Sequence, residues 1–295
     1  MAEAAQFTVA EIELYERPVR LRMPFRFGVV TLTECPQAFA RVRVELPGGT
    51  GAWGAAAEMM APKWFDKNLA LSNEDNFEQL RSVLRLAREA YLSDAAPATA
   101  FGHFARHYGA HVGAAGALGF NPLLAAYGPA LIDRAVLDVV CRARGVSFYD
   151  AMRANLPGMG ELHPQFAGME LPSFLAGLRP ANRIHARHTV GLVDAITRAD
   201  QAERVGDGLP ETLEEVVQAY GHRYFKLKVA GKVEADVQRL QAIAAVLDRS
   251  PQPYFASLDG NEQYESAQGV LELVRGIQAQ PALRRLWDSI LFIEQ

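Results

Sequence analysis

The sequence predicts a mixed α/β fold, with an α+β part over residues 1–154 and the first part of a TIM-type β/α barrel over residues 155–295. One observation is a change of rhythm: strands and then helices come first, and strand–helix alternation begins near residue 185. Another is a lysine pair, an aspartate and a glutamate, each near the end of one of three successive strands. Parallel barrels collect catalytic residues at the carboxyl ends of their strands, so this recurrence indicates an active-site mouth.

Composition excludes several classes of protein. The 49% of hydrophobic and 22% of charged residues are typical of a soluble globular chain. A net charge of −4 without a basic stripe gives no reason to expect a nucleic-acid partner. No stretch is long and apolar enough to cross a membrane, and the first residues lack a secretory pattern. Two distant cysteines, Cys35 and Cys141, make a disulfide framework unexpected, so we expect a cytoplasmic protein.

The first part begins as a β-meander. Residues 8–22 and 38–46 alternate apolar and polar side chains, which is typical of strands with one buried face. Turn residues at 47–49 allow residues 52–58 to return as a third strand. Helices then follow from apolar residues at helical spacing, from N-cap residues and from Gly145 at a C′ position. The expected helices are 73–91, 97–110, 122–144 and 147–153, before a loop-rich boundary at 155–182.

The second part alternates strands and helices. The expected strands are 186–193, 223–229, 254–259 and 289–294, and the helices between them are 211–220, 233–248 and 265–279. This rhythm predicts right-handed βαβ units and a parallel sheet. A complete barrel needs eight strands and about 250 residues, so these strands supply fewer than half of it. Strand 289–294 would then be an open apolar edge. We therefore expect either a piece of a longer protein or a missing half supplied in trans.

The polar strand ends suggest a specific chemistry. Lys226 and Lys228 share one face of their strand, because side chains alternate. Neighbouring ammonium groups lower each other's pKa, so such a lysine could act as a base near neutral pH. Asp259 and Glu294 would supply hard oxygen ligands suited to Mg²⁺. A Mg²⁺ ion opposite a lysine base suits abstraction of the proton α to a carboxylate, with the metal stabilising the enediolate.

Other interpretations of the same residues stay open. A single lysine on a strand is usually solvated, and a single Asp-Gly-Asn is usually a turn; the recurrence on three strands favours the metal-and-base interpretation. A different class is a catalytically incomplete half-barrel that acts as a binding or interaction module, and Mg²⁺ affinity distinguishes the two. A lyase that forms a Schiff base on Lys226 or Lys228 is a third possibility, which the adjacent carboxylates disfavour.

The same three strands resemble those of the enolase superfamily, in the mandelate racemase and muconate cycloisomerase branch. Residues 224–229 are similar to its Lys-x-Lys strand, and residues 257–262 and 292–295 to the strands with its first and second metal ligands. The resemblance implies that Lys228 removes or returns the α-proton and that Lys226 tunes it and contacts the substrate carboxylate. It implies Asp259 and Glu294 as Mg²⁺ ligands, with Asn261 in support.

The resemblance extends over nearly the whole chain. It implies that residues 1–154 form a capping domain whose loop at Met23–Thr33 closes over the substrate, with Phe25 and Arg26 as substrate contacts. The expected enzyme is an isomerase or lyase, namely a racemase, dehydratase or cycloisomerase of a small carboxylic acid. The family's third metal ligand and second acid/base lie on later strands that this sequence lacks, so two carboxylates alone would bind Mg²⁺ weakly. Barrels of this type often pair through their caps, so we expect a homo-oligomer.

Three other patterns have simpler interpretations. Gly49–Gly54 fits G-x-G-x-x-G, but it lies in an expected hairpin with no helix after it, so it does not indicate a dinucleotide site. His103, His107 and His111 recur every four residues, a spacing that can bind metal. They lie in the expected cap, and a solvated or interface stripe is the preferred interpretation. His185 and His188 lie on or beside the first barrel strand.

Overall fold

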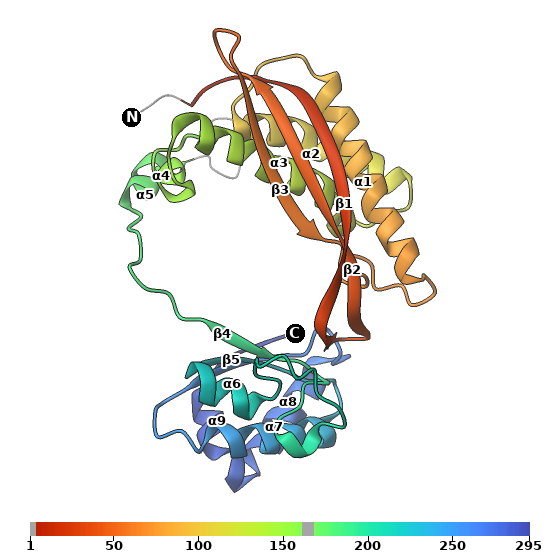
Figure 1. The fold of residues 1–295 in the computed structure, drawn as a ribbon, viewed down its shortest axis with the longest axis vertical. Helices are drawn as coiled ribbons and strands as arrows, with labels where there is room; N and C mark the ends of the chain where they lie inside the picture. Colours follow the sequence, from red (N-terminus) through yellow and green to blue (C-terminus); the bar gives the residue numbers. More distant parts are fainter. Residues whose placement is uncertain (1–3, 161–167) are drawn as a thin grey trace. The chain divides into compact units, whose positions relative to one another are not determined.

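The computed structural model describes residues 4–160 and 168–295, which form two compact units. The N-terminal unit comprises the described parts of Met1–Val19 and Glu34–Ala181. The C-terminal unit comprises Arg20–Thr33 and Asn182–Gln295, so a segment that is early in the sequence packs with the late strands (Figure 1). Within the described ranges, no helix has the length and apolar character that crossing a membrane requires.

The N-terminal unit combines a three-stranded sheet with helices. The strands, in sheet order, are β1 (Thr8–Phe27), β2 (Val30–Glu45) and β3 (Gly51–Met59), and β2 and β3 are antiparallel. The helices are α1 (Asn73–Ser93), α2 (Ala100–Ala117), α3 (Pro122–Arg144), α4 (Phe148–Arg153) and α5 (Leu171–Gly177). One face of the sheet is apolar and fully buried, with Ala40, Val42 and Val44 each 0% exposed. Helix α3 packs against β3 to close this core.

The caps explain where these helices begin and end. Ser72 accepts a hydrogen bond from the Asp75 N–H to start α1, and Asn121 does the same from Leu124 for α3. Gly145 ends α3 with a left-handed φ of 62°, as its sequence position predicts. Helix α2 begins later than expected because Thr99 provides its N-cap. Helix α5, with its buried Leu171 and Leu175, lies in the stretch expected to be loop; residues 161–167 of that stretch lie outside the described residues.

The loop expected at Met23–Thr33 is much shorter in the structure, so its expected bounds are wrong. Strand β1 continues to Phe27 and β2 starts at Val30, so only a tight turn at Gly28 and Val29 separates them. The alternation of exposed and half-buried side chains continues through Arg22, Met23 and Pro24, and a proline is tolerated because β1 is an edge strand. Gly28 adopts φ 49°, a left-handed conformation that favours glycine. We call Arg20–Thr33 the hairpin tip.

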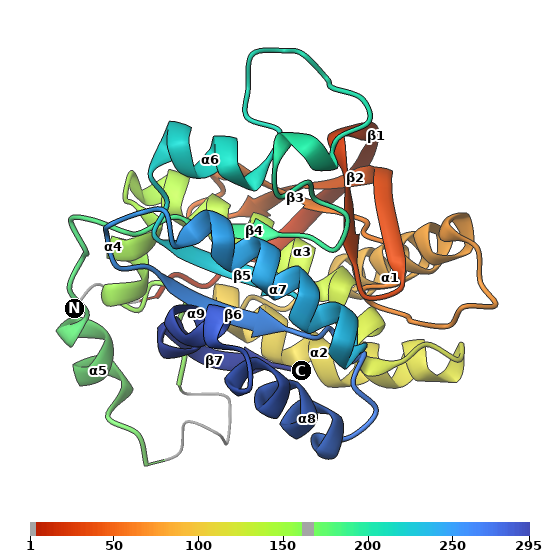
Figure 2. The same ribbon diagram turned by 90° about the horizontal axis from the view of Figure 1, so that it is seen from below.

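The C-terminal unit is a parallel sheet with helices between its strands, as the sequence predicts. The strands β4 (Arg187–Val190), β5 (Tyr224–Lys228), β6 (Phe255–Asp259) and β7 (Ile290–Glu294) lie side by side in chain order (Figure 2). The helices are α6 (Leu213–Tyr220), α7 (Val233–Leu247), α8 (Ala267–Gln278) and α9 (Arg284–Ser289), with short 3₁₀ turns at Arg198–Asp200 and Pro281–Leu283. Helix α9 and the turn before it were not expected.

The alternation of side chains along these strands separates the core from the polar face. Phe225, Leu227 and Leu258 are at most 1% exposed and share one core with residues of α7 and α8. Lys226 and Lys228 alternate with Phe225 and Leu227 along β5 and therefore project to the opposite face of the sheet. Burial of this apolar set fixes the register of the strands, because a slip of one residue would bring both lysines into the core.

Candidate active site at the strand ends

Strand register brings four predicted residues together. Lys228 pairs with Asp259 and Asp259 pairs with Glu294, so the carboxyl ends of β5, β6 and β7 are aligned. The Lys228 Nζ donates to Asp259 Oδ2 at 2.6 Å. The Lys226 Nζ lies 2.6 Å from the same oxygen and donates to Glu294 Oε2 at 2.7 Å. Two ammonium groups therefore share one buried carboxylate oxygen, and a second carboxylate neutralises Lys226.

Asn261, expected to support the site, contacts both Lys228 and Asp259. Its side-chain Oδ1 accepts a hydrogen bond from Lys228 Nζ at 2.6 Å, and its backbone N–H donates to Asp259 Oδ1 at 2.9 Å. Asn261 and Glu262 both have left-handed backbone, with φ of 47° and 61°. Non-glycine residues in this region cost of order 1 kcal/mol each and concentrate at functional sites. The loop after β6 is thus held in a strained shape that aims Asn261 at Lys228.

The two lysines are electrostatically unequal. Burial lowers the pKa of Lys228, which is 5% exposed; contact with Asp259 opposes this shift and the charge of Lys226 adds to it, and the result is a lowered pKa. Burial also lowers the pKa of Lys226, but hydrogen bonds to Asp259 and Glu294 outweigh it and raise the pKa overall. The prediction that neighbouring lysines lower each other's pKa is therefore right in direction for Lys228 and wrong for Lys226.

Asp259 and Glu294 have the oxygen donors that a Mg²⁺ ion requires. The Asp259 side chain is 2% exposed and the Glu294 side chain 49% exposed, so one ligand would be fixed and the other accessible to solvent. Burial favours the neutral form of Asp259, but hydrogen bonds from Lys226 and Lys228 lower its pKa overall and keep it ionised. Within residues 4–160 and 168–295, no third histidine, cysteine or carboxylate joins this pair as a candidate ligand. The pair fits Mg²⁺ that binds through one or two carboxylates and completes its shell with substrate and water.

The hairpin tip lies beside this site within the C-terminal unit. A Cβ added to Gly28 would lie 3.6 Å from the Asn261 Cβ, so the turn packs against the loop after β6. The Phe25 ring packs against Gly191, and the exposed Arg26 accepts a hydrogen bond on its carbonyl from the Leu192 N–H at 3.1 Å. The two predicted substrate contacts therefore lie on a segment that is attached to the loops after β4 and β6.

Sequence reasoning missed the residues that brace the site. Asp236, 3% exposed, accepts hydrogen bonds from the Ala230 and Lys232 backbone N–H groups at 2.7 and 3.0 Å. It also accepts one from the Tyr264 hydroxyl at 2.7 Å, which fixes the loop that follows Lys228. The sequence signal that could have identified Asp236 is its position as an acidic residue in the first turn of a helix that follows a strand. Arg22 likewise holds the hairpin tip through Asp207, at 2.6 and 2.5 Å, and lowers the pKa of that carboxyl to about 2.

The histidine stripe is not solvated, which corrects the preferred interpretation. His103 and His111 are 1% and 3% exposed. Their Nε2 atoms lie 2.7 and 2.9 Å from the carbonyl oxygens of Phe7 and Ala125. The helix face that carries them is turned into the N-terminal unit because α2 packs against α3. In the C-terminal unit, His185 precedes β4, whereas His188 lies within it and stacks on His222.

No family model matches the chain, and no curated protein matches it either. Solved structures do. An N-succinyl Arg/Lys racemase from Bacillus cereus superposes with a TM-score of 0.55 at 17% identity, over 98% of this chain and 59% of that one. A mandelate racemase/muconate lactonizing protein from Herpetosiphon aurantiacus gives 0.54 at 17% identity, over 92% and 58%. An enolase from Bradyrhizobium, complexed with magnesium and mandelic acid, gives 0.53 at 16% identity, over 94% and 60%.

These likenesses confirm the expected resemblance at the level of fold alone: the architecture of the chain is similar to that of solved structures of a racemase, a mandelate racemase/muconate lactonizing protein and an enolase. The chain spans about three-fifths of the length of the solved structures that it matches. At identities of 16–17%, the agreement is one of architecture, and the chemistry has to be argued from the side chains described above.

Proposed function

From the fold that the chain shares with mandelate racemase and muconate lactonizing enzymes, we propose that it carries the proton-abstracting part of a Mg²⁺-dependent active site. The substrate would be a small carboxylic acid that loses the proton α to its carboxylate. The observation that carries this proposal is the cluster of Lys226, Lys228, Asp259 and Glu294 at three aligned strand ends. In this proposal the C-terminal unit is the first part of a β/α barrel and the N-terminal unit is its cap.

The unequal lysines support different roles. Lys228, with the lowered pKa, has the larger fraction of free amine near neutral pH and would accept the α-proton. Lys226, with the raised pKa, stays protonated and would contact the substrate carboxylate. Its positive charge also keeps the pKa of Lys228 low. The hydrogen bond to Asn261 orients the Lys228 Nζ. Proton transfer requires this orientation, because the nitrogen has to lie within reach of the α-proton of the substrate.

Asp259 and Glu294 would hold Mg²⁺ in this proposal. When bound, the ion supplies positive charge that stabilises the enediolate form of the substrate. The protein's own contribution is to keep Asp259 ionised in a buried position through its two lysine contacts. The neighbouring structures include one complexed with magnesium, which supports the same ion here.

The hairpin tip would cover the substrate. Its packing against Asn261 and the loops after β4 and β6 supports Phe25 and Arg26 as substrate contacts. Arg26 adds a positive charge suited to an acidic substrate. The named racemase among the neighbours favours an isomerase over a lyase. The homo-oligomeric state and the cytoplasmic location stay predictions from the sequence.

Exchange of the α-proton with solvent tests the proposal. The natural protein that contains this chain is incubated in D₂O with Mg²⁺ and a panel of α-hydroxy acids and N-acyl amino acids. We expect the α-proton NMR signal of one class to disappear, and Lys228→Met to slow this exchange by about 10²–10⁴-fold. Lys232→Met is the matched control, because Lys232 is exposed and lies in the loop beyond β5.

Two outcomes would count against this function. Equal exchange in Lys228→Met and the unaltered protein would remove Lys228 as the base. A folded protein that binds no Mg²⁺ and exchanges none of the acids would instead favour the non-catalytic binding module.

A further inference from the structure

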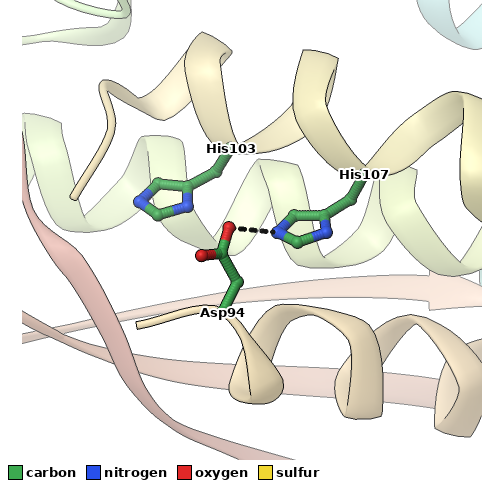
Figure 3. Close-up of side chains that lie close together, drawn as sticks. All are labelled: Asp94, His103 and His107. Atoms are coloured by element: carbon green, nitrogen blue, oxygen red, sulfur yellow. Dashed lines mark ion pairs between the residues drawn. The ribbon is translucent and has the colours of Figure 1, made fainter. Parts of the chain in front are cut away.

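Three side chains of the N-terminal unit meet between α1 and α2. Asp94 is the C-cap residue of α1, and His103 and His107 lie one turn apart on the same face of α2. The carboxylate of Asp94 points toward both rings (Figure 3). One possible ligand atom from each residue lies within 4.8 Å of the others. This cluster combines the two imidazoles and one carboxylate that are typical of transition-metal sites.

The ring of His103 is oriented by a backbone hydrogen bond, as the ring of a metal-binding histidine usually is. Its Nε2 lies 2.7 Å from the Phe7 carbonyl oxygen, and because a carbonyl can only accept, this nitrogen carries the proton. The lone pair is then on Nδ1. This atom is buried and, within the described parts of the chain, has no hydrogen-bond partner. A histidine whose second nitrogen donates to a backbone carbonyl has its free lone pair fixed in direction, which is the usual support of a metal ligand.

His107 and Asp94 present further donor atoms to the same point. His107 Nε2 lies 3.2 Å from Asp94 Oδ2, yet it makes no hydrogen bond of acceptable geometry with any described residue. Burial lowers the pKa of both His103 and His107, so both rings are neutral near pH 7 and their lone pairs are available. Their side chains differ in access: His103 is 1% exposed, whereas the His107 side chain is 12% and the Asp94 side chain 19% exposed. An ion can therefore enter from the side of His107.

The surroundings of Asp94 both help and oppose a cation. Its Oδ1 accepts a hydrogen bond from the Ala96 N–H at 2.9 Å, which fixes the carboxylate. Its Oδ2 also lies 2.6 Å from Arg106 Nη1, so the carboxylate is ionised but shared. An incoming ion has to displace or accommodate this guanidinium, which lowers the affinity that the three ligands alone would give.

We propose that Asp94, His103 and His107 form a binding site for a divalent transition metal ion, with Zn²⁺ as the expected ion. Zn²⁺ accepts nitrogen and carboxylate ligands at about 2.0–2.2 Å, which places tetrahedral ligand atoms about 3.4 Å apart. His107 Nε2 and Asp94 Oδ2, 3.2 Å apart, already have about this spacing. The His103 ligand atom lies within 4.8 Å of both, so it would close by at most about 1.4 Å around the ion, and water would fill the fourth position on the exposed side. Mg²⁺ does not fit, because it requires oxygen ligands. Such an ion would tie the end of α1 to the first turns of α2 and stabilise the N-terminal unit.

Calorimetric titration of the chain with ZnCl₂ tests the proposal, in a Glu294→Gln background that removes one carboxylate of the strand-end site. We expect one Zn²⁺ per chain. Asp94→Asn and His107→Gln should weaken binding by more than about 100-fold, since even the loss of a partner of a ligand costs 10–100-fold. His111→Gln is the matched control: His111 is buried on the same helix and its Nε2 contacts a carbonyl, but it is not in the cluster. The His111→Gln variant should bind Zn²⁺ with the same affinity as the Glu294→Gln background.

Thermal unfolding followed by circular dichroism provides a second readout that also reports whether each variant folds. Zn²⁺ at 100 times its Kd should raise the melting temperature by about 5 °C in the background and leave Asp94→Asn unchanged. The proposal is overturned if the folded chain binds no Zn²⁺ at 1 mM, or if Asp94→Asn and His107→Gln bind as the background does. It is also overturned if Mg²⁺ produces the same shift as Zn²⁺.

Discussion

Replacing Asp259 with alanine is expected to lower the free energy of unfolding by about 3–5 kcal/mol at pH 7, because removing one partner of a buried ion pair leaves an uncompensated charge. Lys228 is 5% exposed, and among the described residues Asp259 is the only carboxylate within hydrogen-bond distance of it. In the variant, Lys228 would keep only its hydrogen bond to the neutral amide of Asn261. At pH 7 the loss of stability cannot exceed about 5 kcal/mol, because Lys228 can release its proton instead. Releasing it costs about 1.36 kcal/mol for each unit by which the pH lies below the ordinary pKa of lysine.

The pH dependence of this loss has a definite sign. Without Asp259, the pKa of Lys228 in the folded chain falls further below its value in the unfolded chain, since Asp259 raises this pKa more than the charge of Glu294 does. The unfolded state then binds more protons, so the stability of the variant rises with pH toward 10 and its deficit shrinks. Urea unfolding at pH 7 and pH 9.5 measures both effects.

Two further variants serve as controls for Asp259→Ala. The double variant Lys228→Met, Asp259→Ala should recover most of the loss, because no buried charge is left unpaired. Glu294→Ala should cost less than about 1 kcal/mol, because the Glu294 side chain is half exposed. If the single and double variants are equally unstable, the ion pair is not what stabilises this position.

Gly54→Ala is expected to cost about 3 kcal/mol, at the upper end for overpacking. Gly54 lies on β3, and a Cβ there would meet the backbone N of Val139 and lie 2.5 Å from the carbonyl oxygen of Ala135, both on α3. Backbone atoms of a packed helix cannot move aside as a side chain can. Gly54 therefore serves the close approach of α3 to the sheet.

Gly51→Ala on the same strand is the matched control. A Cβ at Gly51 would lie 3.4 Å from the Arg43 guanidinium, which is flexible and can move. Its cost should stay below about 1 kcal/mol. Chemical unfolding of both variants measures the difference, and a Gly54→Ala variant as stable as Gly51→Ala would contradict the close packing of α3 on β3.

Periodicity and caps predicted most of the elements because each depends on local sequence. Helix α3 begins and ends where Asn121 and Gly145 indicate. The parallel strands were found from apolar runs that end in a charge, and the alternation of side chains placed Lys226 and Lys228 on one face. The resemblance implied a loop at Met23–Thr33, whereas pairing with the neighbouring strand extends β1 past Pro24 to Phe27 and leaves only Gly28 and Val29 as a turn.

Partner choice could not be predicted, because it depends on register and burial. Spacing shows that two lysines face the same way, but not that both meet Asp259 Oδ2 while only Lys226 meets Glu294. This difference gives the two lysines opposite pKa shifts. Likewise, the spacing of His103 and His107 suggested a surface stripe, since the contribution of Asp94 from another helix is visible only in the tertiary structure.

Titration of the two lysines shows whether Lys228 is the more readily deprotonated amine at the strand ends, and it requires no substrate. The chain is labelled with ¹³C-lysine, the Lys226 and Lys228 side-chain signals are assigned with Lys→Arg variants, and their shifts are followed from pH 6 to pH 12. We expect a midpoint below 10.5 for Lys228 and above 10.5 for Lys226. A Lys228 midpoint at or above 10.5, or above that of Lys226, would contradict the assignment of Lys228 as the proton acceptor.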